Sequence, residues 1–134
     1  MKKIILFVIL FFSPNLKAEV VDLMDKVDSI ECSASYNSSD RQYFYLTIGP
    51  NQPGAPHRRL TFVHEWVESS IHKKRPYPIL SLAYDKDLRI FLMTVNTQQG
   101  VGKVSFAQQK GGIFNDPSSP TQYKLDYCEI RSRL

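Results

Sequence analysis

The sequence predicts an all-β domain, a small antiparallel sandwich or partly closed barrel of about seven strands, with a short N-terminal helix after a signal peptide. Seven short runs rich in aromatic and β-branched residues are separated by turn signals, and helical periodicity extends over a useful length at only one place. Two cysteines near opposite ends of the domain further predict that its first and last strands lie close together.

Residues 1–18 have the three-part layout of a secretory signal peptide. Lys2 and Lys3 precede an unbroken apolar run over residues 4–12, and a polar stretch follows. A membrane-spanning helix needs about 20 residues, so this run is too short to span. We therefore expect a cleaved signal of bacterial type, and we expect the mature protein to be periplasmic or secreted. The alternatives are that residues 1–18 form an uncleaved anchor or a buried N-terminal strand.

Cleavage between Ala18 and Glu19 would leave residues 19–134 as a single β-rich domain of 116 residues. Three lysines and no acidic residue leave with the signal, so the formal net charge falls from +4 to +1. Nucleic-acid binders usually carry a strong basic excess. The mature chain lacks one, and we expect no nucleic-acid partner.

Cys32 and Cys128 lie 96 positions apart. Two cysteines in an exported protein normally pair, and closing a loop of about 100 residues stabilises a domain by about 4.7 kcal/mol in the chain-entropy model. We therefore expect a structural disulfide rather than a reactive thiol. One cysteine near the first strand and one in the last resembles the placement in small periplasmic β-barrel inhibitors of lysozyme; no motif accompanies this likeness, and we assign no family on it.

The predicted elements begin with a helix over residues 19–28, where Val20, Leu23, Met24 and Val27 recur at helical spacing. An isolated helix of this length is marginal, so it should dock on the sheet. The predicted strands are residues 29–36, 43–48, 59–67, 79–84, 88–95, 102–108 and 123–130. Residues 49–57 and 110–121, rich in proline and glycine, are predicted as long loops.

A third connection, residues 68–78, carries the most distinctive local pattern. Four basic or potentially basic residues are followed by two prolines that bracket a tyrosine. Prolines favour a stiff, extended backbone, and such a loop could engage an acidic or phosphate-bearing surface with the tyrosine as anchor. The candidate binding residues are His72, Lys73, Lys74, Arg75 and Tyr77, joined by Arg58 and Arg59 if these elements converge. The alternative is a solvated connection kept soluble by its charge.

No catalytic or metal-binding constellation is recognised. His64-Glu65-Trp66-Val67-Glu68 begins like the zinc-protease motif H-E-x-x-H but ends in glutamate. The spacings of His57, His64 and His72 match no compact metal site, and no G-x-S-x-G elbow is present. We expect neither cofactor nor metal.

These patterns favour an exported, non-catalytic binding module that acts through exposed loops on a macromolecular partner, either a protein or an anionic envelope component. Such a module could be an inhibitor or an envelope accessory protein, with no membrane span in its mature form. One alternative is a carrier of a small apolar ligand, because aromatic side chains can line the interior of a barrel of about eight strands. The other is a small secreted hydrolase whose site is assembled from distant residues.

Overall fold

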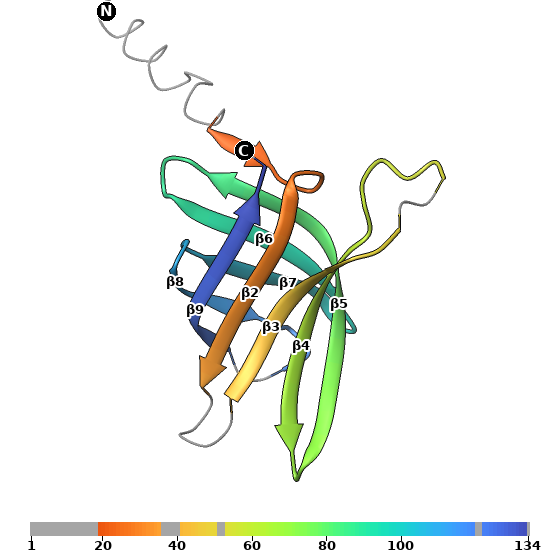
Figure 1. The fold of residues 1–134 in the computed structure, drawn as a ribbon, viewed down its shortest axis with the longest axis vertical. Helices are drawn as coiled ribbons and strands as arrows, with labels where there is room; N and C mark the ends of the chain where they lie inside the picture. Colours follow the sequence, from red (N-terminus) through yellow and green to blue (C-terminus); the bar gives the residue numbers. More distant parts are fainter. Residues whose placement is uncertain (1–18, 36–40, 51–52, 120–121, 134) are drawn as a thin grey trace, which may run out of the picture.

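The computed structural model describes residues 19–35, 41–50, 53–119 and 122–133, which form one antiparallel sheet that closes on itself (Figure 1). Its strands are β1 (Val20–Asp22), β2 (Val27–Ser35), β3 (Arg41–Ile48), β4 (Leu60–Glu68), β5 (Ile71–Asp85), β6 (Ile90–Thr97), β7 (Gly100–Phe106), β8 (Lys110–Asn115) and β9 (Tyr123–Ser132). The strand order β1-β5-β4-β3-β2-β9-β8-β7-β6, with a further pairing of β5 and β6, gives an eight-stranded barrel and one extra strand, β1. The predicted all-β class is confirmed.

The predicted helix over residues 19–28 is wrong. Val20–Asp22 is strand β1, which pairs with the end of β5. A turn follows, in which the amide of Val27 donates to the carbonyl of Leu23. Leu23, Met24 and Val27 are buried, as the helical stripe also required. Burial in the barrel end decides the conformation here, because a helix of one or two turns has little stability of its own.

Part of the segment predicted as a loop over residues 68–78 is also strand. Ser69 and Ser70 form a two-residue turn with positive φ angles of 50° and 65°, the geometry of tight hairpins. Residues 71–78 then belong to β5 and pair with β4 along their whole length. The β4–β5 hairpin projects beyond the neighbouring strands of the barrel (Figure 1).

The segment predicted as a loop over residues 110–121 contains strand β8. Its two glycines allow the backbones of the neighbouring strands to approach closely, and they do not act as flexible loop residues. A Cβ atom on Gly112 would lie 2.1 Å from the carbonyl oxygen of Ser105 on β7, and one on Gly111 would lie 2.4 Å from that of Leu125 on β9. Glycine lets the backbones of these strands come together where any side chain would separate them.

Side chains fill the barrel interior. The largest fully buried ones include Phe44, Phe62, Phe106 and Phe114. The ring centroids of Phe44 and Phe62 lie 5.5 Å apart, and Phe114 meets both rings edge-on. Aromatic pairs at such separations pack favourably. The interior is therefore a hydrophobic core.

The predicted disulfide is present. Cys32 on β2 and Cys128 on β9 lie directly opposite each other, with Cα atoms 4.1 Å apart. It ties the first long strand of the barrel to the last. Residues 1–18 lie outside the described part of the chain, so the signal peptide and its cleavage between Ala18 and Glu19 remain predictions. Among the described residues, no helix has the length and apolar character needed to cross a membrane.

Candidate binding site

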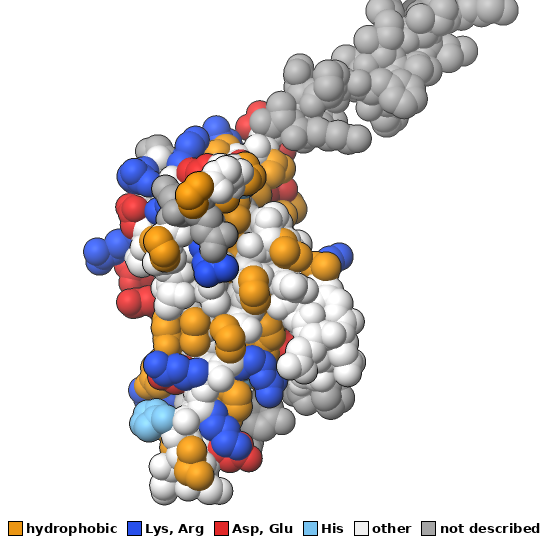
Figure 2. Space-filling model, turned by 90° about the vertical axis from the view of Figure 1, so that its right-hand side faces the viewer, with side chains coloured by type: hydrophobic (Ala, Val, Ile, Leu, Met, Phe, Trp, Pro, Cys, Tyr) orange, Lys and Arg blue, Asp and Glu red, His pale blue; other side chains and the backbone are white. Residues whose placement is uncertain are grey.

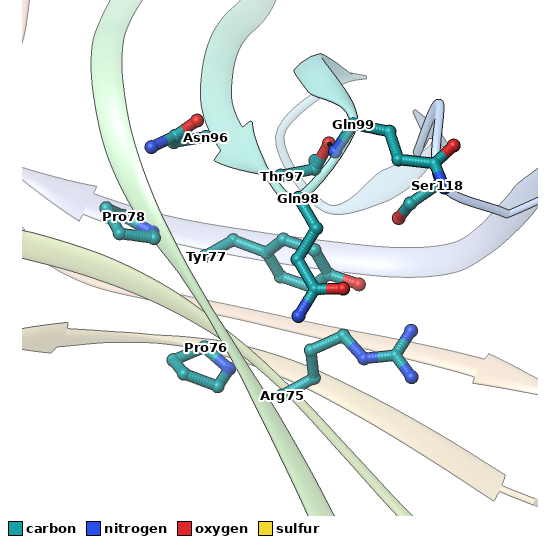
Figure 3. Close-up of a pocket in the computed structure, with 9 residues that line it drawn as sticks. All are labelled: Arg75, Pro76, Tyr77, Pro78, Asn96, Thr97, Gln98, Gln99 and Ser118. Carbon is teal, nitrogen blue, oxygen red and sulfur yellow. Dashed lines mark hydrogen bonds between the residues drawn. The ribbon is translucent and has the colours of Figure 1, made fainter.

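A cleft opens at the hairpin end of the barrel, where β5 separates from β6 (Figure 3). The two strands pair only from Ile79 onward, so the preceding part of β5 stands apart from the β6–β7 turn. The cavity between them has a volume of about 500 Å³. Its lining is mostly polar and consists of Arg75, Pro76, Tyr77, Pro78, Asn96, Thr97, Gln98, Gln99 and Ser118.

Arg75 supplies the positive charge of this cleft. Its guanidinium carbon lies 5.4 Å from the centroid of the Trp66 ring, a cation–π arrangement. A hydrogen bond with Tyr77 is the main reason why the pKa of Arg75 is raised above its usual value. The nearby lysines are already paired with carboxylates: Lys73 is 2.7 Å from Glu68 and Lys74 is 3.5 Å from Glu65.

No carboxylate in the described ranges forms such an ion pair with Arg75. The cleft therefore carries a guanidinium with capacity for an anionic group. A guanidinium presents a planar fork of donors that matches a carboxylate or a phosphate. In Figure 3 the side chain of Gln98 points across the cleft toward Arg75, so an amide could contribute to the same ligand.

Arg75 is hydrogen-bonded to Tyr77, which in turn forms a buried pair with Asp116. The Tyr77 hydroxyl donates to Asp116 Oδ2 over 2.8 Å, and both side chains are buried. Burial raises the pKa of Tyr77, which keeps the hydroxyl protonated as a donor. Burial also opposes ionisation of Asp116, but hydrogen bonds from the hydroxyl and amide of Ser118 and from Tyr77 outweigh it and lower the pKa of Asp116. A fixed negative charge thus lies behind the hydroxyl that contacts Arg75.

His64 is the β4 residue paired with Arg75 across the hairpin, and it does not line the cleft. Its ring stacks on Phe44, with centroids 4.3 Å apart, and lies 4.5 Å from Trp66. Its Nε2 is 2.7 Å from Gln42 Oε1, an acceptor, so this nitrogen carries the proton. Its Nδ1 is buried without a hydrogen-bond partner in the described structure. Burial, and then the charge of Arg75, lower the pKa of His64 to about 4.

This pKa predicts acid-sensitive stability. His64 in the unfolded chain takes up a proton as the pH falls below 6.5, whereas the folded protein resists protonation down to about pH 4. The contribution of neutral His64 to the free energy of unfolding is therefore full above pH 6.5 and is lost as the pH falls from 6.5 to about 4. The pKa difference corresponds to about 3 kcal/mol. Urea unfolding at several pH values should show the decline, and His64→Phe should remove that part of it. An unchanged slope in the variant would contradict the assignment.

The structure brings only part of the predicted binding set together. Tyr77 is buried and serves as a support rather than as an exposed anchor. Arg58 donates to the carbonyl oxygens of Met24 and Val27, which gives it a structural role at the β1–β2 turn. Arg59 is exposed where β4 begins.

The two basic groups lie at opposite ends of β4. Arg58 and Arg59 precede this strand of nine residues, whereas His72, Lys73 and Lys74 pair with its last residues. At about 3.3 Å per residue, the strand keeps the two groups about 20 Å apart. Figure 2 shows basic side chains at both ends of this face, with a band of hydrophobic side chains between them. They do not form one surface.

The polar residues opposite β5 were missed from the sequence. Next to Gly100, Gln98 and Gln99 carry the sequence signal of a hairpin turn and no functional signal, and nothing in the sequence distinguishes Asp116 from other acids. The run Asp116-Pro117-Ser118 could have been recognised as a turn in which the carboxylate accepts from the backbone two residues on. Its contact with Tyr77, 39 positions away, has no sequence signal.

Comparison of the chain with protein-family models, with curated proteins and with solved structures found no match. Across the described part of the chain, no group of three or more His, Cys, Asp or Glu side chains is placed to hold a metal ion.

Proposed function

We propose that this protein is an exported, non-catalytic binding module whose cleft end binds an acidic macromolecular partner. The observation that carries the proposal is Arg75: a guanidinium that has no carboxylate partner among the described residues and is positioned by Trp66 and Tyr77 in a polar cleft. Export is supported by the signal-like N-terminus and by the Cys32–Cys128 disulfide, which is typical of oxidising compartments.

A protein partner fits this face better than a flat anionic envelope surface. A polyanionic surface is bound by several free cations acting together, but Lys73 and Lys74 are already paired with glutamates. A concave cleft with one available guanidinium suits a single carboxylate on a shaped partner. The role would then be that of an inhibitor or an accessory protein that acts by occupying its partner.

The two other functional hypotheses receive less support. A carrier needs a hollow interior, and the interior here is packed with phenylalanine side chains. A hydrolase centred on His64 needs an imidazole that reaches substrate, and His64 is buried between Phe44 and Trp66 with its proton directed to Gln42. Neither arrangement supplies a small-molecule site.

Arg75→Ala should weaken binding of the partner at least tenfold, because a charge-assisted hydrogen bond contributes about 1.5–3 kcal/mol. Partners captured from a cell-envelope extract would be identified by mass spectrometry and titrated against the purified variants by biolayer interferometry. Arg75→Lys should restore only part of the affinity, because an ammonium lacks the planar fork. Lys103→Ala, at an exposed position on β7, is the matched control. Equal affinities for Arg75→Ala and the unaltered protein would refute the proposal.

A further inference from the structure

The β4–β5 hairpin has an open backbone edge. On one side, residues 71–78 of β5 pair with β4. On the other side, no described strand pairs with β5 before Ile79, where β6 begins to do so. In Figure 1 this part of the hairpin extends past the neighbouring strands. An unpaired edge presents backbone N–H and C=O groups to any extended chain that approaches it.

The direction of these groups follows from the hairpin itself. Glu68 and Ile71 flank the two-residue turn and pair with each other, which makes them the first hydrogen-bonded pair of the ladder. Bonding alternates along β5 from there, so the backbone of every second residue after Ile71 bonds to β4. His72 and Lys74 therefore direct their N–H groups to the open edge.

Two prolines agree with this alternation and limit the edge. Pro76 and Pro78 fall at positions whose backbone faces outward, where a missing N–H leaves the β4 ladder intact. They offer carbonyl oxygens but no donors. The open edge thus has two donors, at His72 and Lys74, and ends at the cleft that holds Arg75.

The charged side chains along this edge determine which kind of strand can pair with it. His72, Lys73, Lys74 and Arg75 run consecutively along it. Lys73 and Lys74 are paired with Glu68 and Glu65, so Arg75 is the cation of this run that has no carboxylate partner among the described residues. A second copy of the chain would bring a second such guanidinium to the edge, and like charges facing each other across a strand pair are destabilising. An acidic segment would instead place a carboxylate against Arg75. The edge therefore disfavours self-pairing and favours an acidic partner strand.

We infer that this edge takes an extended acidic segment of the partner by strand addition at His72 and Lys74, and that a carboxylate of the segment binds Arg75 in the cleft. Strand addition is a recurring mode of peptide recognition in which main-chain hydrogen bonds give affinity and side-chain contacts give specificity. The inference rests on the proposed function for its choice of binding face and adds the mode of binding and the chemistry of the ligand.

A matched pair of variants separates the backbone contribution from the charge. Lys74→Pro and Lys74→Ala both remove the ammonium group, but only the proline removes the outward N–H. The ladder with β4 is preserved in both, as it is at Pro76 and Pro78. Thermal unfolding followed by circular dichroism should show that both variants fold like the unaltered protein.

The probe is a blocked hexapeptide of alternating glutamate and valine, titrated into ¹⁵N-labelled protein and followed by NMR. The amides of His72 and Lys74 should shift most. The affinity of Lys74→Pro should be about tenfold lower than that of Lys74→Ala, and a peptide with lysine in place of glutamate should bind at least tenfold more weakly than the acidic one.

Equal affinities of the two Lys74 variants would overturn strand addition, as would absence of binding by the acidic peptide or shifts centred elsewhere. These results are distinguishable from failure of the proposed function. If partner capture depends on Arg75 but is equal in Lys74→Pro and Lys74→Ala, the binding face stands and the mode of binding is wrong. If the peptide adds to the edge but Arg75→Ala leaves partner capture unchanged, the proposed function fails.

Discussion

Replacing Cys32 and Cys128 together by serine should lower the free energy of unfolding by about 2–5 kcal/mol. The disulfide joins β2 to β9 and spans 96 residues, so without it the unfolded chain gains the conformational freedom of a very long loop. Total stabilities of domains this size are about 5–15 kcal/mol, so the loss is a large fraction. Urea denaturation monitored by tryptophan fluorescence would measure it, since Trp66 lies on the hairpin beside the core.

Reduction supplies the control for this experiment. The unaltered protein in excess dithiothreitol should approach the stability of the double variant, and the double variant should not respond to reductant. If the reduced and oxidised proteins unfold at the same urea concentration, the disulfide does not hold the barrel together.

Phe114→Ala should lower the free energy of unfolding by about 3–5 kcal/mol. Phe114 is fully buried. Its ring centroid lies 5.1 Å from that of Tyr77, 5.6 Å from that of Tyr123 and within 6 Å of those of Phe44 and Phe62. Truncation would remove these contacts and leave a cavity against rigid strands on several sides, which cannot close around it.

Ile113→Ala is the matched control, because this neighbour points to the opposite face of β8 and is 41% exposed. It should change stability by less than about 1 kcal/mol. A comparable loss in both variants, or a small loss in Phe114→Ala, would mean that the interior is looser than the structure describes. A loose interior would in turn strengthen the carrier hypothesis.

The sequence predicted well those strands that bury one face. In β7, predicted over residues 102–108 and found as Gly100–Phe106, the buried Val104 and Phe106 alternate with the exposed Lys103 and the partly exposed Ser105. Because the two faces of such a strand meet different environments, apolar and polar residues alternate along its sequence. The neighbouring positions of the first and last long strands likewise followed from the cysteines, because a disulfide restricts the distance between its ends.

Elements whose conformation depends on neighbours were missed. The glycines of β8 look like loop residues until the close backbones of β7 and β9 are present. The prolines of β5 look like breakers, yet they lie in a strand because their outward side has no strand to bond. Local preference is overridden where the sheet accepts the residue at no cost to its hydrogen bonds.

The candidate site was predicted in part. Arg75 was predicted as a binding residue from its local sequence, and in the structure it lines a cleft. That Tyr77 lies near Arg75 could also be predicted, because the two residues are close in the sequence. The burial of Tyr77, however, depends on Asp116, which only the closed barrel brings near. Contacts between residues far apart in the chain carry no periodic signal, so a site assembled from β5, the β6–β7 turn and Ser118 could not be read from one segment.

Photo-crosslinking inside the producing cell tests the central claim most directly. A photoreactive amino acid at Gln98, in the cleft, should form a covalent adduct with the partner, and Arg75→Ala should reduce that adduct at least severalfold. The same amino acid at Leu88, which is 66% exposed in the turn at the other end of β6, should form none. Adducts at Leu88 but not at Gln98 would show that the binding face lies elsewhere and would contradict the account.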